Sequence, residues 1–234
     1  MNYRIKKVAG YLSIFLTLLL YSCSTGQNLN KYGLTVIDNL QYYNNQVKDD
    51  SEKQLIDLKK FIPGIVLDIR YATANNFTKN VVYEESAAFL RKPAAEALKK
   101  VQDELLKDGY GLKIYDAYRP YSATVKFWDL IKNSTYVATP QRGSRHNRGC
   151  AIDLSIIDIK TGKEIEMPTE FDNFTEKAAA NYKPVSSAAE NNRALLQRLM
   201  TKNGFVIYDG EWWHFDYSAW KNFDILDIPF SKLN

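Results

Sequence analysis

From residue 61 onward, segments in which apolar and polar residues alternate are interleaved with segments whose apolar residues recur every three or four positions. Alternation is typical of a strand with one buried face, and the longer period is typical of an amphipathic helix. Because the two kinds come in mixed order with short loops between them, the pattern predicts an α+β fold rather than a doubly wound sheet. We expect strands at 65–71, 112–118 and 151–157, helices at 93–108, 122–131 and from 187, and a closing hairpin within 205–215.

The first residues predict an export signal. Residues 1–7 are basic, and the apolar run from Val8 to Tyr21 is too short to span a bilayer comfortably but suits a signal peptide. The run ends in Leu20-Tyr21-Ser22-Cys23, which resembles a bacterial lipobox, where the cysteine is acylated and becomes the new amino terminus. We therefore expect a lipoprotein-type signal peptide over 1–22 and lipidation of Cys23. Ordinary cleavage near Ser22, with Cys23 left as a free thiol, is the alternative.

Composition changes after the cysteine. Residues 23–54 are rich in Asn, Gln, Lys and Asp and are interpreted as a polar tether, in which the short apolar group Leu34 to Ile37 is a candidate for docking on the domain. Residues 55–234 then form the main domain, of ordinary globular composition. Acylation would give firm anchoring, so we expect an exported, membrane-anchored lipoprotein that faces the periplasm of a bacterial envelope.

Charge and cysteine content exclude some partners and chemistries. The formal net charge is +4 for 234 residues, and three of the basic residues lie in the signal peptide, so no dense basic patch favours a nucleic-acid partner. Two cysteines, Cys23 and Cys150, cannot support a disulfide framework. The chain has only two histidines, His146 and His214, so any histidine chemistry uses one or both of them.

The first candidate segment runs from Ser144 to Asp153. A histidine, His146, lies in a glycine-containing loop, and Asp153 follows inside a predicted strand between isoleucine and leucine. A carboxylate in such a place is costly unless a charged group meets it, and a divalent cation is such a group. A cap or an ion pair with an arginine would account for Asp153 equally well if this segment is considered alone.

The second candidate segment is Glu211-Trp212-Trp213-His214-Phe215, in which a glutamate and the other histidine lie among aromatics. Residues three apart in a flat strand face opposite sides, so both reach one cleft only if the backbone bends, and Asp209-Gly210 just upstream makes a bend plausible. Surrounding aromatics raise a carboxyl pKa, which suits a general base. A core aromatic cluster with two hydrogen-bonded polar members is the simpler alternative for this segment alone.

Taken together, the two segments form a coherent set. Two histidines and one aspartate supply three zinc ligands and leave the fourth position for water, as hydrolytic zinc sites require. Glu211 is then available to take a proton from that water.

The motifs Ser-x-His-x-x-Gly-x-Ala-x-Asp (144–153) and Glu-x-x-His (211–214) resemble those of the D-alanyl-D-alanine dipeptidases, the VanX-like zinc peptidases. Further blocks agree in order: 67–73 with 76–77, 116–120, 170–172, 192–196 and 204–205. The resemblance covers roughly residues 61–215. It implies the fold shared with bacterial carboxypeptidases and the Hedgehog signalling domain, with a mostly antiparallel central sheet and flanking helices.

By position, the resemblance implies that His146, Asp153 and His214 bind one zinc ion per chain. Glu211 would be the general base and then the acid that protonates the leaving amine. Arg70 would stabilise the oxyanion, although a salt bridge to Asp68 or Asp116 is its alternative role. Two residues would contact the substrate: Asp172 at the free ammonium, and Ser144 near the metal.

The expected function is zinc-dependent hydrolysis of D-alanyl-D-alanine, or of a similar small D-amino-acid dipeptide, in cell-wall turnover or scavenging. The alternatives are a D,D- or L,D-carboxypeptidase that trims longer peptidoglycan stem peptides and, from another class, a non-catalytic wall-binding lipoprotein. The non-catalytic alternative predicts that Glu211 or a metal ligand is missing, but Glu211 and the three ligands are all present. The expected partners are a small dipeptide and, through the lipid anchor, a membrane. Cys150 departs from the small residue expected beside the zinc loop and is interpreted as a buried apolar filler.

Overall fold

The structure is a computed structural model that describes residues 29–233. The predicted signal peptide over 1–22 and the lipidation site Cys23 lie outside the described residues.

A five-stranded sheet forms the centre of the molecule, with strand order β2-β4-β5-β7-β6. Its strands are β2 (Val66–Leu67), β4 (Tyr110–Asp116), β5 (Ala151–Asp158), β7 (His214–Tyr217) and β6 (Phe205–Ile207). Only the β2–β4 pair of this sheet is parallel. The expected α+β class with a mostly antiparallel central sheet is therefore confirmed.

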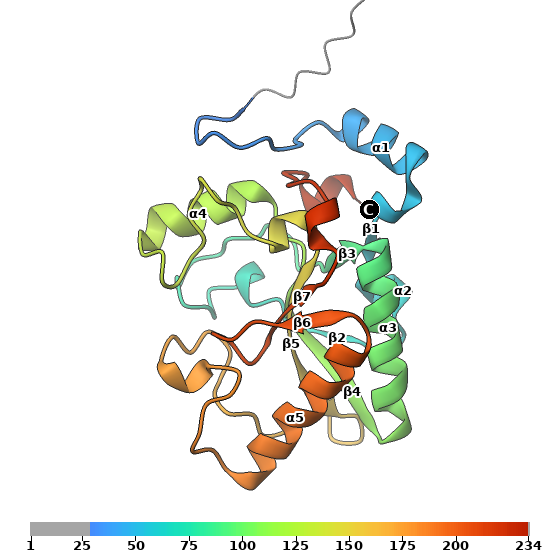
Figure 1. The fold of residues 1–234 in the computed structure, drawn as a ribbon, viewed down its shortest axis with the longest axis vertical. Coiled ribbons are helices and arrows are strands. Elements are labelled where there is room, and N and C mark those ends of the chain that lie inside the picture. Colours follow the sequence, from blue (N-terminus) through green and yellow to red (C-terminus); the bar gives the residue numbers. More distant parts are fainter. Residues whose placement is uncertain (1–28, 234) are drawn as a thin grey trace, which may run out of the picture.

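Three longer helices flank this sheet (Figure 1). Helices α3 (Lys92–Lys107) and α5 (Ser187–Lys202) pack against each other and against β4 and β6, respectively, whereas α4 (Tyr121–Ile131) lies apart from them. The apolar stripe of α3 that the periodicity predicts is buried, and the helix ends before Gly109, which has a φ of +80°. Helix α5 begins at residue 187 as expected, and its capping residue is Ser186, whose side chain accepts from the amide of Ala189.

The strand expected at 65–71 is shorter than predicted. Only Val66–Leu67 pair with β4, and Arg70–Ala72 form a single 3-10 turn in which the amide of Ala72 donates to the carbonyl of Ile69. The turn places both Ile69 and Tyr71 in the core, at 3% exposure each. Burial of these two side chains outweighs continuation of an edge strand, so the strand expected over 65–71 ends after Leu67.

The described part of the predicted tether is folded. Helix α1 (Leu40–Asp49) is followed by β1 (Leu55–Asp57), which pairs with β3 (Phe89–Arg91), and by the short helix α2 (Leu58–Phe61). The apolar group that ends at Ile37 docks on the domain, where Ile37 is 3% exposed. Burial of Ile37 and Tyr43 anchors this segment, which polar composition alone does not reveal.

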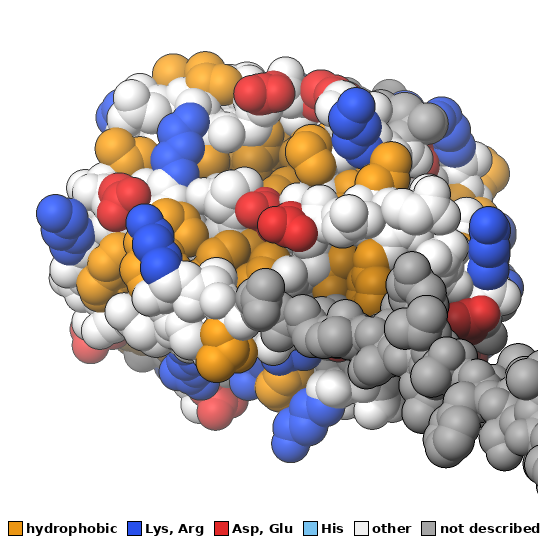
Figure 2. Space-filling view, turned by 90° about the horizontal axis from the view of Figure 1, so that it is seen from above, with side chains coloured by type: hydrophobic (Ala, Val, Ile, Leu, Met, Phe, Trp, Pro, Cys, Tyr) orange, Lys and Arg blue, Asp and Glu red, His pale blue; other side chains and the backbone are white. Residues whose placement is uncertain are grey.

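Basic, acidic and apolar side chains are interspersed over the face seen from above (Figure 2). Within residues 29–233, no helix combines the length and the hydropathy that crossing a membrane requires.

Candidate active site

The register of the neighbouring strands β4, β5 and β7 determines which side chains meet at the site. Asp153 of β5 lies directly across from His214 of β7 on one side and from Asp116 of β4 on the other. An irregularity in β4 between Ile114 and Asp116 shifts the pairing and brings Asp116 into this row. Directly paired residues project from the same face, so the three polar side chains gather over one patch of the sheet.

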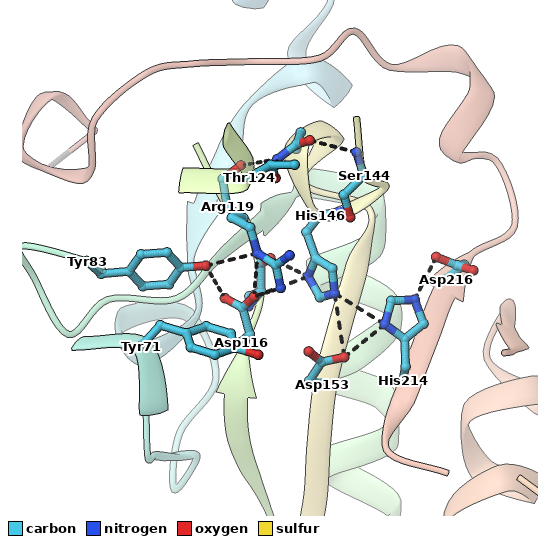
Figure 3. Close-up of polar contacts among 12 residues, drawn as sticks. Tyr71, Tyr83, Asp116, Arg119, Thr124, Ser144, His146, Asp153, His214 and Asp216 are labelled. Carbon is cyan, nitrogen blue, oxygen red and sulfur yellow. Dashed lines mark hydrogen bonds and ion pairs between the residues drawn. The ribbon is translucent and has the colours of Figure 1, made fainter. Parts of the chain in front are cut away.

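The second histidine reaches this patch from a loop. His146 begins a 3-10 turn, His146–Arg148, just before β5, and it is 3% exposed. Its Nε2 lies 3.2 Å from Nδ1 of His214 and 3.5 Å from Oδ1 of Asp153, and the last two atoms are 2.9 Å apart (Figure 3). The structure thus brings the three predicted ligands together.

These atoms fit a zinc ion. Donors about 2.0–2.1 Å from a tetrahedral metal lie about 3.3 Å from one another, close to the separations of 2.9 to 3.5 Å found here. The set comprises one oxygen and two imidazole nitrogens, a combination that zinc accepts.

The other nitrogen of each imidazole is held by an acceptor. Nδ1 of His146 donates to the carbonyl of Ala117 at 2.7 Å, and Nε2 of His214 donates to Oδ1 of Asp216 at 3.1 Å. Asp216 is held in turn by Nη1 of Arg145 at 2.5 Å. These bonds orient each ring so that the remaining nitrogen faces the shared position.

Sequence reasoning missed Asp216. The signal was its place two residues after His214 in a strand, because alternation puts such a pair on one face.

Hydrogen bonds and opposite charges favour the ionised forms of Asp153 and His214, although burial opposes them. Burial acts to raise the pKa of Asp153, but the charges and hydrogen bonds of His146 and His214 lower it below the ordinary range. Burial acts to lower the pKa of His214, but its bonds to Asp153 and Asp216 raise it to about 10. A cation is therefore favoured here, either as a proton or as a metal, and metal binding displaces that proton.

Glu211 lies beside the metal donors in a turn. The amide of Glu211 donates to the carbonyl of Tyr208, and the amide of His214 donates to that of Glu211, so the predicted bend is present before β7 begins. Oε2 of Glu211 is 3.9 Å from Nδ1 of His214. Burial is the largest influence and raises the pKa of Glu211, which suits a general base.

A cavity of about 260 Å³ opens onto these residues. Its lining includes the three ligands, Glu211, Ser144 and Arg119. The loop that carries His146, residues 143–149, is called here the metal loop. The hydroxyl of Ser144 accepts from the amide of His146 at 3.2 Å, so this predicted substrate contact also belongs to the metal loop.

Arg70 and Arg119 lie in different surroundings. Nε of Arg70 donates to Asp68 at 3.0 Å, the guanidinium lies over the ring of Tyr115, and Arg70 is absent from the lining of the cavity. Arg119 does line the cavity, where Nε and Nη2 donate to Asp116 at 3.0 and 2.6 Å. The geometry thus favours the salt-bridge alternative for Arg70 and places a different arginine at the site.

Asp172 lies near the cluster but outside the lining of the cavity. Its Oδ1 accepts from the hydroxyl of Tyr71 at 3.0 Å, and its buried Oδ2 has no hydrogen-bond partner among the described residues. Burial, followed by the charge of Asp153, raises the pKa of Asp172 to about 8. A buried carboxylate with a free oxygen suits a positively charged ligand group.

Three ligand donors, a half-buried carboxylate beside them and a cavity above them are the arrangement of a metal-dependent hydrolase. Residues 51–228 match the model of the D-Ala-D-Ala dipeptidase family of M15 peptidases. The chain is similar to the D-alanyl-D-alanine dipeptidase of Escherichia coli K12, with 36% identity over 178 residues, 76% of this chain and 92% of the relative. It is also similar to the Enterococcus faecalis V583 enzyme of the same name, with 32% identity over 70% of this chain and 91% of the relative.

The chain therefore belongs to the D-Ala-D-Ala dipeptidase family and is a peptidase. Among solved structures, that of the LdcB LD-carboxypeptidase has a TM-score of 0.39 and 27% identity, covering 57% of this chain and 63% of that chain.

Proposed function

We infer that this protein hydrolyses D-alanyl-D-alanine, or a similar small D-amino-acid dipeptide, with one zinc ion held by His146, Asp153 and His214. The observation that carries the inference is the convergence of these three donors, all within 4.8 Å of one another, below a cavity that Glu211 also lines. The curated relatives described above bear the name D-alanyl-D-alanine dipeptidase, which supports this substrate.

When bound, the zinc ion would lower the pKa of a water molecule and polarise the peptide carbonyl. Glu211 takes the proton from the attacking water and passes it to the leaving amine nitrogen as the carbon–nitrogen bond breaks. Its raised pKa, caused chiefly by burial, makes it a stronger base than an ordinary carboxylate. The apolar neighbours Trp212 and Trp213, at 0% and 1% exposure, keep the turn that carries Glu211 in place.

Arg119 stabilises the negative charge that develops on the carbonyl oxygen. The family resemblance implies Arg70 for this role, but of these two arginines Arg119 is the one that lines the cavity. Asp116 binds Nε and Nη2 of Arg119, so the guanidinium is held in one orientation with Nη1 outside these two bonds. A fixed cation that needs no reorganisation is effective at stabilising developing charge.

The two charged ends of a dipeptide have matching groups nearby. The free oxygen of Asp172 suits the substrate ammonium, and its partner Tyr71 lies under the guanidinium of Arg119, 5.4 Å from ring centroid to Cζ. Arg142 is an exposed cation in the cavity lining, and it suits the substrate carboxylate. A requirement for both free ends distinguishes a dipeptidase from a carboxypeptidase.

The decisive experiment is hydrolysis of the four stereoisomers of Ala-Ala, with N-acetyl-D-Ala-D-Ala and a longer stem peptide as comparisons. We expect zinc-dependent cleavage of D-Ala-D-Ala and no cleavage of the acylated substrates. Cleavage of the longer peptide alone would support the carboxypeptidase alternative. Glu211→Gln should abolish turnover while zinc remains bound, and an unchanged rate would reject the proposed base.

The proposal includes export and attachment to the bacterial envelope through acylated Cys23, with a role in cell-wall turnover or scavenging. The lipobox-like sequence at 20–23 supports this attachment. The test is fatty-acid labelling and membrane fractionation of Cys23→Ser, with Cys150→Ser as the matched control. Cys150 is 0% exposed, and burial raises its thiol pKa to about 12, so it is a poor acceptor. Equal labelling of the two variants would refute the anchor.

A further inference from the structure

A segment that precedes the family match is packed beside the metal loop. The match begins at residue 51, whereas residues 29–49, called here the N-terminal arm, are folded onto the domain. Within the arm, Ile37 is 3% exposed and Leu34 is half-buried. The arm therefore packs on the domain through these two apolar side chains.

The arm binds one short stretch near the carboxyl end. The amide of Ile37 donates to the carbonyl of Ile225 at 2.9 Å, and the amide of Asp227 donates to the carbonyl of Ile37 at 2.8 Å. These two bonds form a parallel bridge between Ile37 and Leu226. Residues 225–227, the C-terminal stretch, are thus held on one side by the arm.

The same stretch contacts the metal loop on its other side. The amide of Leu226 donates to the carbonyl of Asn147, the residue after His146, at 2.9 Å. Side chains pack there too: a Cβ added to Gly143 would lie 2.9 Å from Cδ1 of Ile225 and 3.6 Å from Cδ1 of Leu34. The arm and the C-terminal stretch therefore close directly over the loop that carries His146.

Asn147 connects this loop to the rest of the site. It is 0% exposed, and its Nδ2 donates to the carbonyl of Arg119 at 2.9 Å and to Oγ1 of Thr124 at 2.8 Å. Its Oδ1 accepts from the amide of Ser144 at 2.7 Å. Figure 3 shows Arg119, Thr124 and Ser144 around His146. One buried amide thus joins the loop after β4, helix α4 and the metal loop.

We propose that Asn147 and the N-terminal arm are positioning elements of the metal site. The arm holds the C-terminal stretch, this stretch holds Asn147, and Asn147 sets the places of His146 and Arg119. His146 lies in a loop outside the ladder of the sheet, so its position depends on such side-chain and packing contacts. This inference rests on the proposed zinc site but not on the identity of the dipeptide.

Four variants of the full chain test it. Asn147→Asp keeps the side-chain shape and the acceptor for Ser144 but removes both Nδ2 donors. Ile37→Ala keeps the backbone bridge and removes buried packing. Leu34→Ala shortens a half-buried side chain that lies near Gly143 of the loop. Val36→Ala is the matched control, because Val36 is half-buried in the same arm and, among the described residues, its backbone makes no hydrogen bond to residues 225–227.

Zinc affinity is measured by competition with a chromophoric chelator. We expect the zinc Kd to rise about tenfold in Asn147→Asp. In Ile37→Ala and Leu34→Ala we expect a rise of about threefold, with kcat falling more than KM changes. Val36→Ala should match the parent chain. The double variant Ile37→Ala/Asn147→Asp should raise the Kd by less than the product of the single effects, because both act along one route.

Amide hydrogen exchange of the metal-free protein gives a readout independent of zinc and of activity. The amides of Leu226 and Ser144 should exchange faster in Ile37→Ala than in Val36→Ala, since both report on the contacts around Asn147. Unchanged zinc affinity and unchanged exchange, with only a lower Tm, would overturn the inference. If the parent chain binds no zinc, the proposed function fails, and the exchange comparison alone decides whether the arm positions the loop.

Discussion

Replacing Asp172 with asparagine should change how the stability of the protein depends on pH. Asp172 has a φ of 60°, a left-handed conformation that asparagine also adopts, so the substitution adds little backbone strain. It keeps an oxygen that accepts from Tyr71 and removes only the titrating group. The variant therefore isolates the effect of one buried carboxyl.

The magnitude follows from the raised pKa. The carboxyl pKa is 3.8 as an ordinary value and about 8 in the folded protein, so between these values the folded state binds one more proton than the unfolded state. Stability from this group is therefore present at low pH and is lost as the pH rises toward the folded pKa. The loss is at most about 1.4 kcal/mol per pH unit, or about 3 kcal/mol between pH 5 and pH 7.

The assay is urea unfolding of metal-free parent protein and Asp172→Asn at pH 5, 6 and 7. The variant should gain stability relative to the parent across this range. Tyr71→Phe is a second test, because the hydroxyl of Tyr71 lowers the pKa of Asp172. Without this hydroxyl, the free energy of unfolding should continue to fall up to a higher pH than in the parent protein. Parallel stability curves for the parent and Asp172→Asn would refute the reasoning.

Activity gives a second readout of the same carboxyl. If ionised Asp172 binds the substrate ammonium, kcat/KM should rise with pH up to the pKa of Asp172, and Asp172→Asn should lack this rise. Zinc would offset the contribution of Asp153 but not that of burial, so the rise in the loaded enzyme should level off at or below about pH 8.

Four other predictions concern the metal, the oxyanion and the core. Asp216→Asn should weaken zinc binding by about 10- to 100-fold in a chelator competition, and an unchanged Kd would contradict its role in orienting His214. Arg119→Lys should lower kcat by about 100-fold or more while Arg70→Lys has a small effect, and equal losses would remove the distinction between them. Trp213→Ala should cost about 3–5 kcal/mol of unfolding free energy in urea, because this side chain is 1% exposed. Zinc at about 100 times its Kd should raise the unfolding free energy by about 2.7 kcal/mol over the chelated protein, and an unchanged Tm would argue against a site preformed for zinc.

The secondary structure of the central domain was accessible from sequence because it depends on local patterns. The helix predicted at 93–108 is α3, and the strand predicted at 151–157 is β5, each within a residue or two of its observed bounds. Periodicity failed at 65–71, where two apolar side chains enter the core through a 3-10 turn. It also failed over the described part of 23–54, where a few buried anchors such as Ile37 fold an otherwise polar segment.

The sequence by itself determined the chemical inventory of the site: two histidines, the aspartate in a buried strand, and a glutamate three residues before the second histidine. Tertiary structure decided which further groups complete it. Asp153 meets His214 through strand register, Asp216 supports His214, and Arg119 rather than Arg70 lines the cavity. Register, bulges and loop packing depend on contacts between residues far apart in the chain, so no local pattern of residues encodes them.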